Sequence, residues 1–141
     1  MGPRGFYEAK RRHSSASVLK GKVLEQGTTV SNGSVRSMFT GISLSEFARV
    51  ENVHAAADGD GIEVDFSSIA INNIAEGSGN NGIAVGTNSV LRANVAANNR
   101  GGGFYVYCPS SVIGNSASGN VANFVLITTG GNCTVSENSA P

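Results

Sequence analysis

The sequence predicts an all-β solenoid of about five to six stacked parallel coils, with a period of about 21 residues. The first observation is a segment that recurs at this spacing, as Gly61–Val64, Gly82–Val85 and Gly103–Val106. The second is a column of asparagines with nearly the same period: Asn32, Asn52, Asn73, Asn94, Asn115 and Asn138. Two columns with one period indicate one structural coil per repeat.

Composition agrees with a fold that turns many corners. Nineteen of the 141 residues are glycine, and glycine and asparagine both tolerate the positive φ angles that corners require. No window carries the i, i+3, i+4, i+7 apolar stripe of a helix. The length fits one domain. The ten basic and ten acidic residues cancel, which argues against a nucleic-acid partner held by phosphate neutralisation.

The chain divides into an N-terminal arm or cap, residues 1–26, and a repeat body, residues 27–141. The arm carries six of the ten basic residues, and its segment Ser17–Leu24 is the part most suited to pair with the body. The basic run Lys10–His13 is interpreted as a solvated tail, because no groove of aromatic and basic residues follows it. We expect either that the arm covers the first coil or that chains associate there.

Within each coil, the first strand alternates apolar and other residues, as a half-buried strand does. The alternation predicts an inward column of Ile62, Val64, Phe66; Ile83, Val85, Thr87; Phe104, Val106, Cys108; Phe124, Leu126 and Thr128. It predicts an outward strip of Ser43, Ser45; Glu63, Asp65; Ala84, Gly86; Tyr105, Tyr107; Val125 and Ile127. The six column asparagines are expected at one corner, where each amide bonds to the next and forms a ladder.

The two cysteines, Cys108 and Cys133, lie 25 residues apart. They are either free buried thiols or one bridge between adjacent coils, and the spacing does not choose between the two, so the redox compartment stays open. No apolar run is long enough for a membrane span, so we expect a soluble protein without a membrane partner. The basic N-terminus has no apolar segment of the kind found in signal peptides, and no compartment is assigned.

Five segments resemble the right-handed parallel β-helix repeat proteins, which share the architecture of pectate lyases and polygalacturonases. They are Asn32–Val35, Gly41–Leu44, Asp58–Val64, Gly131–Val135 and Asn138–Pro141. The resemblance covers about residues 27–141 and implies a right-handed parallel β-helix. It also implies that a polysaccharide, if one binds, lies along the outward strip. Members of the family usually carry further N-terminal coils and a cap, where this chain has only the short arm.

Four acidic residues are the candidates for chemistry. Glu63 and Asp65 are the candidate catalytic carboxylates, and Asp58 and Asp60 are the candidates for a calcium site, with no other cofactor expected. The simpler interpretation, which we favour, is that all four are solvated. No basic residue of the kind that lyase chemistry needs lies on the strip. The Asp58–Gly61 turn also lacks the glutamate that closes an EF-hand loop.

Outward apolar residues on adjacent coils form the second candidate site: Tyr105, Tyr107, Val125 and Ile127. Contiguous apolar patches of this kind contact a partner. Self-association into a homo-oligomer is the leading interpretation, and stacking on a polysaccharide is the second. The sequence therefore predicts a non-catalytic structural or binding module that self-associates through this strip or through an exposed end coil. The alternative is a carbohydrate-active enzyme, a polysaccharide lyase or glycoside hydrolase, that uses Glu63 and Asp65.

Overall fold

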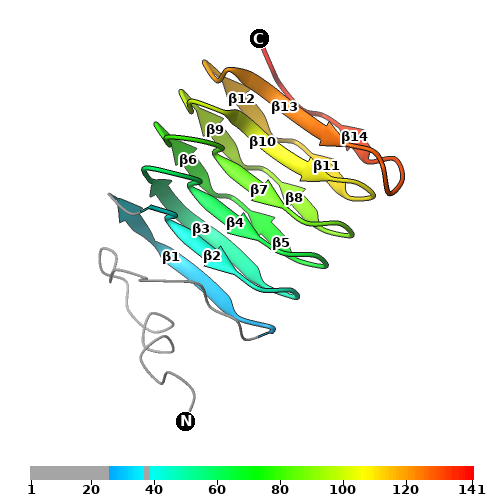
Figure 1. The fold of residues 1–141 in the computed structure, drawn as a ribbon, viewed down its shortest axis with the longest axis horizontal. Helices are drawn as coiled ribbons and strands as arrows, with labels where there is room; N and C mark the ends of the chain where they lie inside the picture. The colour runs from blue at the N-terminus through cyan, green and yellow to red at the C-terminus, as the bar shows by residue number, and fades with distance from the viewer. Residues whose placement is uncertain (1–25, 37–38) are drawn as a thin grey trace.

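The structure is a computed structural model that describes residues 26–36 and 39–141. This part of the chain forms fourteen strands and no helix. The strands wind into about five coils stacked along one axis, from blue at the N-terminal end to red at the C-terminal end (Figure 1). The predicted all-β solenoid is thereby confirmed. The arm predicted for residues 1–26 lies outside the described residues apart from Gln26, so its capping role stays a prediction.

Each coil contributes one strand to sheet A, whose strands are all parallel and lie in the order β13-β10-β7-β4-β2. Their bounds are β2 (Ile42–Leu44), β4 (Ile62–Val64), β7 (Ile83–Val85), β10 (Gly102–Tyr107) and β13 (Ala122–Ile127). In Figure 1 these strands form a row that rises from β2 to β13. No helix that could cross a membrane occurs among the residues that the structure describes.

The remaining nine strands form sheet B, which bends into two arms. One arm holds β1 (Thr29–Arg36), β3 (Arg49–Ala56), β5 (Ile69–Ile71), β8 (Val90–Arg92), β11 (Ser111–Ile113) and β14 (Thr134–Ser136). The other holds β6 (Ile74–Glu76), β9 (Val95–Ala97) and β12 (Ser116–Ser118). Strands β1 and β3 pair along their whole length and are long enough to belong to both arms, since Arg49 pairs with Ile69 of β5 and His54 with Ile74 of β6.

Equivalent residues of successive coils lie side by side, as the repeat predicts. Ile62 pairs in register with Ile83, and Ile83 pairs with Phe104. The three side chains are fully buried, and the ring of Phe104 stacks on that of Phe124 with centroids 5.0 Å apart. Stacking like on like in this way fills the interior of the solenoid with one apolar column from each strand position.

The predicted inward column is wrong at its last member in several coils. Phe66 is 40% exposed and Thr128 is exposed, while Thr87 is half-buried. Strand β4 ends at Val64 and a turn begins, so the strict alternation of an extended strand no longer decides which way the next side chains point. Cys108 is buried, as predicted.

A ladder of buried asparagines runs through the corner between the two arms of sheet B. The amide nitrogen of Asn73 donates to Oδ1 of Asn94 at 3.0 Å, and Asn94 and Asn115 each repeat the contact to the next member, ending at Asn138. Each Oδ1 also accepts a backbone N–H, as when Asn94 receives that of Asn73 at 2.9 Å. The ladder therefore satisfies polar groups that the corner would otherwise bury without partners.

The other two predicted members, Asn32 and Asn52, do not belong to this ladder. The register pairs Val53 with Gly33, and the Val53 N–H donates to Oδ1 of Asn73, so Val53 holds the ladder position of its coil. Asn32 and Asn52 lie one residue earlier, are exposed, have φ near +58° and +54°, and share a separate hydrogen bond of 3.2 Å. The coil before Asn73 is one residue shorter, so spacing alone does not separate the two columns.

Two further polar ladders occupy the remaining corners. In one, the backbone N–H groups of Ser68 and Ser89 donate to the hydroxyls of Ser89 and Ser110, each at 3.1 Å. In the other, the amide of Asn99 donates to Oδ1 of Asn120 at 2.8 Å. Neither ladder is among the features predicted above, although Ser68, Ser89 and Ser110 recur every 21 residues.

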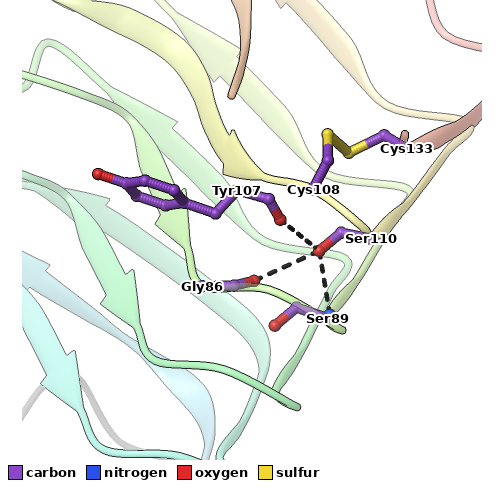
Figure 2. The surroundings of a disulfide bond; sticks show 6 residues. All are labelled: Gly86, Ser89, Tyr107, Cys108, Ser110 and Cys133. Carbon is purple, nitrogen blue, oxygen red and sulfur yellow. Dashed lines mark hydrogen bonds between the residues drawn. A yellow bond between two sulfur atoms is a disulfide. The ribbon is translucent and has the colours of Figure 1, made fainter. Parts of the chain in front are cut away.

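A disulfide bond between Cys108 and Cys133 joins the last two coils (Figure 2). It decides between the two states that the sequence left open for these cysteines. Beside it, the hydroxyl of Ser110 lies 2.8 Å from the Tyr107 carbonyl oxygen and accepts the N–H of Ser89. The bridge therefore anchors the end of β10, which carries Tyr107, to the segment that leads into β14.

Candidate functional site

The outer face of sheet A carries the residues that the sequence singled out. Register pairing places Glu63, Ala84, Tyr105 and Val125 side by side on successive coils. A second row runs parallel to it, in which Tyr107 pairs with Ile127. The predicted strip is thus one continuous surface that changes from acidic at β4 to aromatic at β10 and aliphatic at β13.

A hollow of about 320 Å³ lies in the middle of this surface. Small residues, Ala84 and Gly86, form its floor, and Glu63, Asp65 and the aromatic side chains of Phe66 and Tyr107 also line it. We call this hollow the sheet A groove. It exists because the coil of β7 places two small residues, Ala84 and Gly86, between coils that carry larger side chains.

The floor of the sheet A groove requires glycine at position 86. A Cβ atom added there would lie 2.5 Å from the backbone nitrogen of Phe66 and 2.8 Å from the carbonyl carbon of Asp65. These are backbone atoms of the preceding coil, so neither can move without disturbing the stack. Gly86 lets the two coils approach closely, and the N–H of Gly86 donates to the Val64 carbonyl at 3.0 Å.

The two carboxylates of the groove are exposed and carry no ion pair within the described residues. Glu63 accepts a hydrogen bond of 3.3 Å from the hydroxyl of Ser43, and Asp65 accepts the N–H of Phe66 at 2.8 Å. On sheet B, by contrast, an ion pair joins Arg49 to Glu51 at 2.7 Å, and Nε2 of His54 is hydrogen-bonded to Glu76 at 2.9 Å.

Aromatic side chains border the groove on two sides, with Phe66 beside the carboxylates on the coil of β4 and Tyr107 forming an aromatic wall on the coil of β10. Tyr107 is 45% exposed and meets Tyr105 edge to face, with ring centroids 5.6 Å apart. Phe66 meets Phe47 in the same way at 5.9 Å. The side-chain hydrogen bond with Tyr107 raises the pKa of Tyr105 above its ordinary value, with smaller contributions from the charge of Tyr107 and from desolvation.

Val125 and Ile127 extend the aromatic wall along β13. Both are half-buried, and they lie beside Tyr105 and Tyr107 in register. In the part of the chain that the structure describes, β13 is the last strand of sheet A, so its second edge has no strand partner. The four residues predicted as a binding strip are therefore contiguous, with Tyr107 the most exposed.

The two candidates for a calcium site have different surroundings. Asp60 lies in the turn before β4, and its Oδ1 accepts the amide of Asn80 at 2.9 Å and the N–H of Asn81 at 2.8 Å. Asp58 is exposed. Among residues 26–36 and 39–141, no three His, Cys, Asp or Glu side chains come close enough to hold a metal ion. Asp60 thus serves to connect its turn to the next coil.

The sequence pattern predicts Phe66 in the core, whereas the structure places it in the groove lining. Its ring neighbour Phe47, which is 53% exposed at a corner of the preceding coil, is not predicted at all. The only signal was the break in alternation after Val64, where Asp65, Phe66 and Ser67 interrupt the strand. Of the other residues that could take part in catalysis, His54 lies on sheet B beside Glu76, and Cys108 forms the disulfide bond with Cys133.

The family to which the chain belongs is given by its match to a family model. The model described as "Right handed beta helix region" matches residues 12–140, nearly the whole chain. No curated protein and no solved structure matches the chain. The stacked parallel coils and the family match agree, and the chain is a member of the right-handed β-helix family.

Proposed function

We propose that the protein is a non-catalytic binding module that holds a saccharide chain along the sheet A groove. The observation that carries this proposal is the composition of the groove, where exposed aromatic side chains stand beside hydrogen-bonding carboxylates over a floor of small residues. Aromatic faces stack on the apolar faces of sugar rings, and carboxylates accept hydrogen bonds from hydroxyl groups. A shallow groove across a flat sheet also suits an extended ligand better than a compact one.

The carboxylates are better suited to binding than to catalysis. Glycoside hydrolysis needs one carboxyl group whose pKa is raised by burial so that it can donate a proton at neutral pH. Glu63 and Asp65 are both exposed, and no lysine, arginine or histidine lines the groove among the described residues. A lyase would need such a base near the acids. The enzyme alternative therefore lacks the environment that would activate its two residues.

Affinity electrophoresis in native gels that contain a polysaccharide tests the proposal. The full chain should be retarded by at least one of the polysaccharides tested, and Tyr107→Ser should lose most of the retardation. Phe39→Ser is the matched control, because Phe39 is an exposed aromatic residue, 86% accessible, that does not line the groove. Incubation with the same polysaccharide should release no new reducing or unsaturated ends. Equal retardation of all three proteins, or none by any polysaccharide, would contradict the proposal.

Self-association through Tyr105, Tyr107, Val125 and Ile127 is the second candidate function. It is supported by the contiguity of these residues on β10 and β13, the latter being the last strand of sheet A in the described part of the chain. Sedimentation velocity over a range of concentrations measures it. If the paired change Tyr105→Ser and Tyr107→Ser lowers the size of the assembly, the strip is a subunit contact. If the size is unchanged but polysaccharide retention is lost, saccharide binding is the function of the strip.

A further inference from the structure

We infer that the saccharide held by the sheet A groove is positively charged, an amino-sugar chain with free amino groups. This inference rests on the proposed function, because it names the chemical class of ligand for the same groove. It is carried by three features of the groove as residues 26–36 and 39–141 form it: carboxylate oxygens without partners, a lining without a cationic side chain, and aromatic faces beside the acids.

The first feature is the unused capacity of the two carboxylates. Glu63 is bonded only through Oε2, to Ser43, and Asp65 only through Oδ1, to the N–H of Phe66. Within the described residues, no donor reaches Oε1 of Glu63 or Oδ2 of Asp65. Both oxygens therefore remain available to a ligand. An ammonium group, with three donors and a positive charge, is the partner that satisfies two such acceptors best.

The second feature is the sign of the charge around the groove. Among the residues that the structure describes, its lining contains two acidic residues and no basic one. Of the arginines that the structure describes beyond Arg36, Arg49 is paired to Glu51 on sheet B, and Arg92 and Arg100 do not line the hollow. A polyuronate or another anionic chain would be repelled by the acids of this groove, whereas a cationic chain would be attracted to it. Charge therefore discriminates between saccharides that stack equally well.

The third feature is the position of the aromatic rings. Phe66 and Tyr107 line the same hollow as the two carboxylates, and both are about two-fifths exposed. Aromatic faces attract ammonium groups as well as sugar rings, so they stabilise the same ligand as the acids do. A neutral sugar would use the stacking and the hydroxyl hydrogen bonds of this site but gain nothing from its charge.

Isothermal titration calorimetry, which measures the affinity of the full chain for each of four hexasaccharides, tests the inference. The probes are hexamers of glucosamine, N-acetylglucosamine, glucose and galacturonate, compared at one pH at which the amines of the first are protonated. We expect the glucosamine hexamer to bind about tenfold more tightly than its acetylated counterpart, because two exposed ion pairs and one cation–π contact contribute modestly each. Raising the salt concentration should reduce that difference.

The paired change Glu63→Gln and Asp65→Asn should abolish the preference while leaving the affinity for the N-acetylglucosamine hexamer unchanged. Glu137→Gln is the matched control, since Glu137 is an exposed acid at a corner of sheet B that does not line the groove. Thermal melts confirm that each variant is folded.

The remaining outcomes contradict either the charge inference alone or the proposed function as well. Equal binding of charged and neutral hexamers, or tightest binding of the galacturonate hexamer, overturns the charge inference and leaves saccharide binding intact. A preference that survives the paired change also overturns it, because the acids would then not be its source. Binding of none of the four overturns both the inference and the proposed function.

Discussion

The side-chain amide of Asn73 donates to Oδ1 of Asn94 at 3.0 Å, and that same oxygen accepts the backbone N–H of Asn73 at 2.9 Å. The side-chain oxygen of Asn94 thus binds both the side chain and the main chain of Asn73 on the neighbouring coil. The amide nitrogen of Asn94 meanwhile donates to the Ala70 carbonyl at 2.8 Å. All of these groups are buried, so the corner depends on the amide for its hydrogen bonds.

Replacing Asn94 by alanine should therefore be strongly destabilising. The change removes the acceptor of the Asn73 N–H, one of the two acceptors of the Asn73 amide and the amide donor of the Ala70 carbonyl, and should lower the free energy of unfolding by about 3 kcal/mol or more. Urea denaturation followed by circular dichroism measures the loss. Asn132→Ala is the control, because Asn132 is exposed, and its change should be near neutral. Equal effects of the two changes would show that the ladder contributes little.

Extending the second asparagine ladder should stabilise the protein. Ser78 holds the place that Asn99 and Asn120 hold in later coils, and its hydroxyl is buried without a hydrogen-bond partner within the described structure. Gly61 leaves beside Ser78 the space that Gly82 leaves beside Asn99. Ser78→Asn should therefore raise the free energy of unfolding by about 1 kcal/mol. A lower denaturation midpoint than that of Ser78→Ala would contradict this.

The disulfide should stabilise the last coil substantially. It closes a segment of 25 residues, and a loop of that length predicts a loss of about 3 kcal/mol when the bridge is removed. Both cysteines should become serine together, so that no free thiol remains. The denatured protein should also react with no thiol reagent until a reductant is added. One or two reactive thiols before reduction would be inconsistent with the bridge.

The floor of the groove should not tolerate a side chain at position 86. Gly86→Ala forces a Cβ against the backbone of Asp65 and Phe66, and should cost about 2 kcal/mol of stability while it also narrows the groove. Gly33→Ala provides the comparison, because a Cβ at Gly33 meets no atom within 4 Å. Thermal melts and polysaccharide retention should both fall for the first change and stay near wild type for the second.

The tyrosine pair should titrate abnormally. Because the hydrogen bond with Tyr107 raises the pKa of Tyr105 above its ordinary value of 10.0, Tyr105 should ionise late in an absorbance titration of phenolate. Its folded pKa exceeds its unfolded pKa, so its contribution to stability is complete below the unfolded value and is lost as the pH rises through the folded one. Tyr107→Phe should move the late transition toward the ordinary value, whereas Tyr7→Phe should not.

The sequence alone determined the architecture, because a solenoid is specified by local repetition. Ile62, Ile83 and Phe104 recur at the coil period, and stacking one coil on the next brings such residues together without long-range information. The outward strip followed from the same alternation. The acidic, aromatic and aliphatic parts of the candidate site could therefore be predicted from the sequence.

Only the tertiary structure decided what happens at the corners, where the chain leaves the extended conformation and alternation stops. Asn52 and Asn73 share a spacing close to the period, yet a one-residue difference in coil length puts them in different columns, one exposed and one buried. Phe66 turns outward for the same reason and becomes a wall of the groove. The pairing of Cys108 with Cys133 also required the stack, since it depends on how the last corner folds back rather than on the period.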